Sequence, residues 1–180
     1  MTPNVQIKLI QISLKILGVL LNKEKNPFVI AIDGPAGSGK GTVAKKLANK
    51  LNYHYLDSGA IYRVIAYAVK KNNIKPTSVH KLIDLVMKSK IKFSNDMVWL
   101  NDEDVSTLIR TELIGKLASE IAIYEELRAS IMDFQREFCR LPGLVAEGRD
   151  MTSIVFPNAN LKIYLNASVD ERAKRRYKQL

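Results

Sequence analysis

The chain has 180 residues, of which 47% are apolar and 26% charged, and it carries a formal net charge of +10. This length allows one domain with its own hydrophobic core, and the composition excludes a disordered or fibrous protein. Cys139 is the single cysteine, so a disulfide within the chain is excluded and a cytoplasmic location is expected. The positive charge fits an anionic partner. Because it is spread along the chain without interleaved aromatic residues, phosphate binding is favoured over nucleic-acid binding.

Residues 1–26 form an apolar, lysine-bearing extension of unknown role. The stretch VQIKLIQISLKILGVLLNKEKN includes Lys8 and Lys15 and has no run of 18 uncharged apolar residues, so a membrane span is not expected. No small-residue cleavage site follows it, which argues against a signal peptide. An amphipathic appendage, a start codon assigned too early and a helix on a membrane surface remain as alternatives. Asn26 and Pro27 mark the boundary of a domain that we expect over residues 27–180.

Residues 28–51 show the pattern of a strand, a glycine-rich loop and a helix. FVIAIDG (28–34) is a short apolar run that predicts a buried strand, and apolar residues recurring every fourth position from Val43 predict a helix. Between them lies GPAGSGKGT (34–42). A glycine-rich loop with these flanks is typical of a phosphate-binding loop, and the flanks make the match far more specific than the loop alone.

The residue types of this loop suit phosphate. Glycines allow backbone N–H groups to approach an oxyanion, the helix start adds its dipole, and Lys40 reaches the phosphates as a mobile cation. The usual pattern has Ser or Thr directly after the lysine, whereas here Gly41 follows and the hydroxyl comes at Thr42. One residue along a helix is a turn of about 100°. Thr42 therefore does not take the place of a hydroxyl at position 41.

The middle of the chain predicts a short strand, a hairpin and two helical regions. Residues 53–56 favour a strand, and Asp57 and Ser58 are capping residue types for a helix that begins near Ala60. Residues 91–105 hold two β-prone runs separated by turn residues, which predicts a hairpin. From residue 112 to residue 140 the apolar spacing is helical, up to the Pro-Gly pair that follows.

The last third of the chain returns to strands. GLVAEG (143–148) and NLKIYLNAS (160–168) predict two more strands, the first of them buried. Ser168 and Glu171 form a capping box that opens a final helix. Strands that alternate with helices predict an α/β fold of the P-loop NTPase type, with a mostly parallel sheet flanked by helices.

Cations beside the loop would be needed if the chain transfers a phosphoryl group, because charge develops on that group. Glu147 lies at the end of a predicted buried strand, and Arg149 and Asp150 directly follow it. Ligands of open α/β sheets bind at the carboxyl ends of strands. The candidate cations are Arg63, Arg110, Arg128 and Arg149. His54 and His80 have no partners at ligand spacing, so no metal site built by the protein is expected.

Several motifs taken together resemble the bacterial cytidylate kinases. They are GPAGSGKGT, LDSGAIYR (56–63), IRTE (109–112), PGLVAEGRDM (142–151) and VFPNA (155–159), in order and with compatible spacing over residues 28–180. SGAIYR and EGRDM in one chain are more specific than the loop, because they separate this family from the adenylate and guanylate kinases. The resemblance implies an acceptor-binding insertion at about residues 70–125 and a lid that starts at about residues 168–180.

The resemblance implies transfer of the γ-phosphate of ATP to CMP or dCMP, with Mg²⁺ bound to ATP, by a monomer without a nucleic-acid partner. It implies that Lys40 and Arg149 are catalytic. The implied ATP site comprises Gly34, Pro35, Ala36, Gly37, Ser38, Gly39, Lys40, Gly41, Thr42, Arg175 and Arg176. The implied CMP site comprises Ser58, Tyr62, Arg63, Ser119, Arg128, Arg149 and Asp150. GKGT is usual in this class, which implies that Mg²⁺ relies on nucleotide phosphates and water rather than on a loop hydroxyl.

One geometric condition follows for the CMP site. Ser119 and Arg128 are nine residues apart, so on one continuous helix they would face opposite directions. We therefore predict a helix break near residues 123–125.

The chain also departs from the family pattern. Thr152 and Ser153 stand where the family usually has Gly-Thr, and the sequence stops at Leu180, inside the implied lid. Family members continue with two further arginines and an aspartate that bind the acceptor. The resemblance therefore implies a truncated kinase, and it leaves a catalytically impaired nucleotide-binding remnant as the alternative.

Overall fold

The structure, a computed structural model, describes residues 26–94 and 97–177. The extension at residues 1–25 and the turn of the predicted hairpin at residues 95–96 lie outside these ranges. Within the described ranges, no helix has the length and apolar character needed to cross a membrane.

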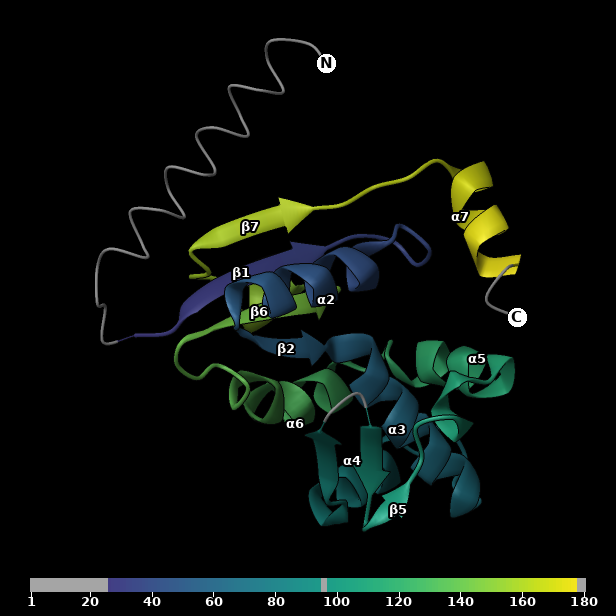
Figure 1. Ribbon diagram of the computed structural model, residues 1–180. Coiled ribbons are helices and arrows are strands. Elements are labelled where there is room, and N and C mark those ends of the chain that lie inside the picture. Colours follow the sequence, from purple (N-terminus) through teal and green to yellow (C-terminus); the bar gives the residue numbers. More distant parts are fainter. Residues whose placement is uncertain (1–25, 95–96, 178–180) are drawn as a thin grey trace, which may run out of the picture.

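A four-stranded parallel sheet forms the centre of the molecule (Figure 1). Its strands are β1 (Phe28–Asp33), β2 (His54–Asp57), β6 (Gly143–Gly148) and β7 (Leu161–Tyr164), in the order β2-β6-β1-β7. All neighbouring pairs are parallel, so the carboxyl ends of the four strands meet at one edge of the sheet. The predicted α/β fold with a parallel sheet is confirmed.

The apolar residues of the sheet alternate between two faces. Ile30 and Ile32 of β1 pack with Val145 of β6 against Ala44 and Ala48 of α2 (Lys40–Leu51). On the opposite face, the remaining apolar residues of the same strands belong to a larger core. Because side chains of a strand alternate in direction, one apolar run buries both faces of the sheet. Val43, expected on the packing face of α2, is 44% exposed and lines the cleft described below.

Helices cover the opposite face and extend beyond β2 (Figure 1). They are α3 (Ser58–Lys71), α4 (Val79–Lys88), η1 (Leu108–Arg110), α5 (Glu112–Ile121) and α6 (Glu125–Arg136). A small antiparallel sheet of β3 (Ile91–Ser94), β4 (Met97–Leu100) and β5 (Glu103–Asp104) lies beside them. This sheet confirms the predicted hairpin and adds a third, two-residue strand.

Three of the later helices carry candidate site residues. The helical stretch from residue 112 is interrupted between Ile121 and Glu125, with Tyr124 in an extended conformation before α6. The predicted break is therefore confirmed. After β6 comes η2 (Met151–Val155), a short π-helical turn, and after β7 comes α7 (Val169–Tyr177), which lies beside the loop that follows β1 (Figure 1).

Candidate active site

The glycine-rich loop joins β1 to α2 with two residues in the left-handed region. Gly37 has a φ of 76° and Gly39 a φ of 90°, values that residues with a side chain rarely adopt. The turn directs the chain into α2, which begins at Lys40. The hydroxyl oxygen of Ser38 is buried and has no hydrogen-bond partner among the described residues. A left-handed glycine turn, a helix start and an orphan hydroxyl suit an oxyanion ligand.

Two arginines of α7 reach the same loop. The Arg175 Nη1 donates to the backbone oxygen of Ser38 at 2.9 Å, and the Arg172 Nη1 donates to that of Ala36 at 3.5 Å. Arg175 is held from the other side by Glu171 at 2.7 Å. The implied ATP residue Arg175 thus lies at the loop, whereas the side chain of Arg176 is outside the described part of the structure.

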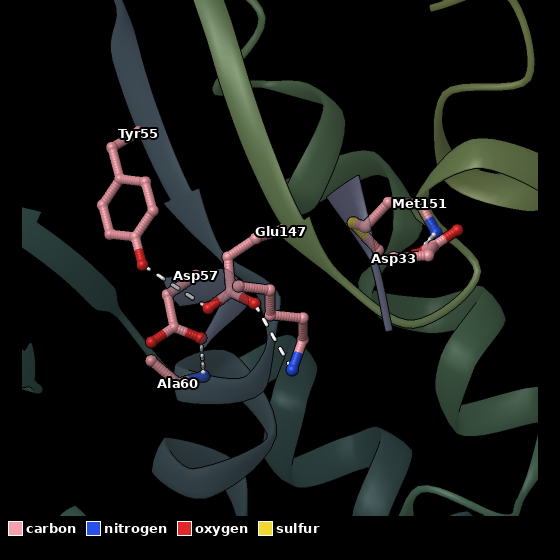
Figure 2. A network of polar contacts seen from close by, with 7 residues as sticks. Asp33, Tyr55, Asp57, Ala60, Glu147 and Met151 are labelled. Atoms are coloured by element: carbon pink, nitrogen blue, oxygen red, sulfur yellow. Dashed lines mark hydrogen bonds and ion pairs between the residues drawn. The ribbon is translucent and has the colours of Figure 1, made fainter. Parts of the chain in front are cut away.

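The carboxyl end of β1 carries Asp33, whose carboxylate accepts hydrogen bonds from the start of η2, and Figure 2 shows the bond from Met151. One oxygen accepts from the backbone N–H of Met151 at 2.9 Å, and the other accepts from the N–H and the hydroxyl of Thr152 at 2.9 and 2.6 Å. These bonds satisfy the first N–H groups of η2, as a helix cap does. Thr152, the departure from the family's glycine, adds a hydrogen bond here, and Asp33 fixes the turn after Arg149 and Asp150.

Glu147 is the centre of a second polar network at the carboxyl ends of β2 and β6 (Figure 2). It is 5% exposed, its Oε2 lies 3.6 Å from the Nζ of Lys40, and its Oε1 accepts from the Tyr55 hydroxyl at 3.5 Å. Asp57 is its partner in the strand register. Burial, followed by the charge of Asp57, raises the pKa of Glu147 to about 7, although Lys40 acts to lower it.

Ser58, at the first position of α3, is a buried member of the implied CMP site. Its side chain oxygen accepts a hydrogen bond of 2.9 Å from the Nε2 of Gln135, a buried residue of α6. Asp57 caps the same helix by accepting from the N–H of Ala60 at 2.9 Å. The hydroxyl proton of Ser58 is therefore available for a ligand, because its oxygen is already an acceptor.

The side chain of Arg63 extends from α3 toward the start of α5. Its Nη1 donates to the backbone oxygens of Ile109 at 2.9 Å and of Thr111 at 3.4 Å. Gly115 makes room for it, since a Cβ at that position would lie 2.9 Å from the Nη2 of Arg63. The guanidinium is thus positioned by a close approach of two helices.

The break between α5 and α6 brings the remaining CMP candidates together. The Arg128 Nη1 donates to the backbone oxygens of Ala122 and Ile123 at 3.1 and 2.9 Å, which closes the end of α5. Burial raises the pKa of Tyr62 to about 12, and the charges of Arg128 and Asp150 act on the same hydroxyl. Ser119, whose hydroxyl donates to the backbone oxygen of Gly115, lines the same cleft as Arg128.

One cleft of about 2580 Å³ joins the loop to these acceptor residues. Its lining includes most of the implied site residues: Ala36, Gly37, Ser38, Gly39, Lys40, Gly41, Thr42, Ser58, Tyr62, Arg63, Ser119, Arg128, Arg149, Asp150 and Arg175. Gly34 and Pro35 are not among the lining residues. Arg149 is exposed, and no ion pair or hydrogen bond of its side chain is found within the described ranges. A pocket for one small ligand holds about 300–1,000 Å³, so this cleft has room for two nucleotides.

Comparison with known sequences agrees with these observations. A sequence profile described as cytidylate kinase matches residues 30–180. This chain belongs to the cytidylate kinase family. A cytidylate kinase of Nitrosomonas europaea is 47% identical over 157 residues, which are 87% of this chain and 70% of the relative. Those of Cupriavidus necator and Polynucleobacter asymbioticus are 51% and 52% identical over 152 residues, which are 84% of this chain and 68% and 69% of the relatives.

At the site of this family member, Asp33, Tyr55, Gln135 and Arg172 had no assigned role in the sequence. Asp33 accepts a hydrogen bond from the backbone N–H of Met151, Tyr55 donates one to Glu147, and Gln135 donates one to Ser58. The place of Asp33 at the end of a predicted strand was a usable signal. Gln135 gave no signal, because a polar residue within an amphipathic helix is ordinarily exposed.

Proposed function

We propose that this protein transfers the γ-phosphate of ATP to CMP or dCMP and so forms CDP or dCDP. The observation that carries the proposal is a single cleft lined both by the glycine-rich loop and by Ser58, Arg63 and Arg149. Membership of the cytidylate kinase family supports the same activity. The alternative, an impaired nucleotide-binding remnant, is not favoured.

The donor side of the site is the loop. We propose that the backbone N–H groups of Gly37, Gly39 and Lys40 face the ATP phosphates, while the Lys40 ammonium neutralises charge on the transferred group. Arg175, which reaches the loop from α7, is the lid residue of this proposal. Phosphoryl transfer needs no covalent intermediate, so positioning and charge stabilisation supply the catalysis.

The acceptor side binds the CMP phosphate. In this proposal Ser58 and Arg63 hold the phosphate oxygens, and Arg149 lies between donor and acceptor as a catalytic cation. Ser119, Arg128 and Asp150 contact the cytosine side, and Tyr62 lies near the CMP phosphate. Burial of Ser58 and the backbone bonds of Arg63 support preorganised positions for these groups.

Mg²⁺ belongs to the ATP substrate in this proposal. Within the described residues, no group of three or more His, Cys, Asp or Glu side chains is arranged to hold a metal ion. The loop suits an ion that arrives with the phosphates and keeps its water, which is how Mg²⁺ ordinarily binds. A cytoplasmic location and a monomeric state stay predictions.

A coupled assay with ATP, Mg²⁺ and CMP tests the proposal. We expect turnover, and replacement of Lys40 by Met should lower kcat about 10²–10³-fold, the loss typical of one electrostatic stabiliser. Lys46→Met is the matched control, since Lys46 is an exposed lysine of the same helix. ATP binding without CMP binding or turnover would instead support the remnant.

A further inference from the structure

Glu147 and Asp57 lie close together at the carboxyl ends of β6 and β2 (Figure 2), and with Lys40, the first residue of α2, they form a charge cluster. The cluster contains two carboxylates and one ammonium group. Asp57 and Glu147 are register partners on adjacent strands, so their side chains leave the sheet side by side. Asp57 acts on Glu147 by charge and by a side-chain hydrogen bond.

Lys40 is the cation that offsets the negative charge of this cluster. Its Nζ lies 3.6 Å from the Oε2 of Glu147, and the two side chains are 17% and 7% exposed. A buried carboxylate that loses its cation is strongly penalised, and it ordinarily takes up a proton instead. Lys40 is also the residue that the proposed function assigns to the ATP phosphates. Nucleotide phosphate and Glu147 therefore compete for one ammonium group.

We propose that Glu147 is a positioning residue that holds Lys40 in the nucleotide-free protein and takes up a proton from solvent when nucleotide phosphates bind Lys40. The proton is then shared with Asp57, the carboxylate beside it. This inference rests on the proposed nucleotide site, and it adds that nucleotide binding is coupled to the uptake of a proton.

The surroundings of Glu147 favour proton uptake over another counter-ion. Tyr55 of β2 presents a hydroxyl to the Oε1, Asp57 of β2 presents a carboxylate, and Lys40 of α2 presents the ammonium group. Arg110 acts on Tyr55. Without Lys40, the groups that act on Glu147 are a neutral hydroxyl and a negative charge, and the bound phosphates add further negative charge.

The absence of a side chain at Gly41 leaves room for the Glu147 carboxylate beside Lys40. A Cβ at position 41 would lie 3.1 Å from the Oε1 of Glu147 and 3.7 Å from the Tyr55 hydroxyl. With a Ser or Thr directly after Lys40, as in the usual loop pattern, the Oε1 of Glu147 would have to shift by a few tenths of an ångström. The position directly after Lys40, which lacks the usual hydroxyl, is thus the position beside which the Glu147 carboxylate lies.

Isothermal titration calorimetry of the whole chain with ADP tests the inference. Titrations at pH 8 with excess EDTA, in buffers of different ionisation enthalpy, measure the number of protons taken up per ADP bound. Phosphate groups, with a second pKa of about 6, are already ionised at this pH. Because the pKa of Glu147 is about 7 before binding and rises further, we expect an uptake of about 0.9 proton. The Kd for ADP should then rise about eight-fold from pH 7.5 to pH 8.5.

Glu147→Gln removes the titrating group and keeps the side-chain size. This variant should bind ADP with an uptake near zero and with a Kd that does not change with pH. Glu120→Gln, at an exposed carboxylate of α5, should behave like the unmodified chain. ADP binding without proton uptake by the unmodified chain would overturn the inference, even if the Gln variant does not fold. Absence of ADP binding would overturn the proposed nucleotide site and the inference with it.

Discussion

Gln135 reaches the site only through another residue. Its amide is buried in α6, 77 positions along the chain from Ser58, and donates to the Ser58 oxygen at 2.9 Å. A neutral hydrogen bond contributes about 1 kcal/mol, and a hydroxyl whose oxygen is already an acceptor is oriented to donate. The side chain of Ser58 is thus fixed before CMP binds.

Replacing Gln135 by Leu should weaken CMP binding selectively. Loss of one orienting hydrogen bond of about 1 kcal/mol corresponds to a KM for CMP raised about five-fold, with the KM for ATP unchanged. Steady-state kinetics with each substrate varied in turn measures this. The control is a double-mutant cycle, because Gln135→Leu should have no further effect when Ser58 is already Ala. An equal loss in both backgrounds would show that Gln135 acts on the core rather than on Ser58.

Glu147 also makes the stability of the free protein depend on pH. Its pKa is raised by burial from 4.5 to about 7, so the folded chain holds this proton more tightly than the unfolded chain does. The contribution of Glu147 to the free energy of unfolding is therefore fully present below the unfolded pKa and is lost as pH rises between about 4.5 and 7. From pH 5 to pH 8 the unfolding free energy should fall by roughly 2 kcal/mol more in the unmodified chain than in Glu147→Gln. Urea unfolding at the two pH values measures the difference, and parallel curves for both proteins would contradict it.

At the scale of elements, the close approach of α3 and α5 positions Arg63. Gly115 lies on the face of α5 that contacts the Arg63 guanidinium. A Cβ at position 115 would lie 2.9 Å from the Nη2 of Arg63. Glycine within a helix costs about 1 kcal/mol relative to alanine. The helix therefore gives up stability at a position where an arginine of the site needs room.

Gly115→Ala should separate stability from CMP binding. We expect an unfolding free energy that is unchanged or up to about 1 kcal/mol higher, because alanine favours the helix and the displaced group is the end of a long side chain. The KM for CMP should rise several-fold, since Arg63 is moved from its backbone partners. Thermal unfolding and steady-state kinetics measure the two effects. Glu120→Ala on the same helix should change neither, and a variant with lowered stability and an unchanged KM would refute the argument.

The elements differ in how far the sequence predicts them. The strands at GLVAEG and FVIAID follow from buried apolar runs, and the break before α6 follows from the requirement that Ser119 and Arg128 share a site. Helix α4 was not predicted, although Leu82, Leu85 and Val86 have helical spacing. The π-helical turn η2 could not be predicted, because it is fixed by Asp33 from a strand 118 residues earlier.

The residues of the candidate site also differ in how far the sequence predicts them. The loop and the arginines belong to short motifs, so the sequence alone predicts them. The cluster of Tyr55, Asp57 and Glu147 exists only because β6 pairs with β2, which no pattern within either strand specifies. Tertiary register, not local pattern, creates those contacts.

At the scale of the whole molecule, the parallel sheet directs both halves of the cleft toward one edge. The loop after β1, the start of α3 after β2 and the turn after β6 all follow carboxyl ends of strands. In open α/β sheets this edge is where ligands bind. The proposed donor and acceptor sites are built from different segments that line one cleft, so each nucleotide should bind while the other is present.

Thermal unfolding with CMP, ADP and both together tests this arrangement. A ligand at about 100 times its Kd stabilises by about 2.7 kcal/mol, which for a domain of this size raises Tm by roughly 5–10 °C. Because the proposed sites of the two nucleotides lie in different parts of one cleft, the rise with both present should be close to the sum of the separate rises. A single shared site would instead give a rise with both nucleotides no larger than with the better ligand alone. Arg63→Met separates the two outcomes further, since it should reduce the rise produced by CMP and leave the rise produced by ADP intact.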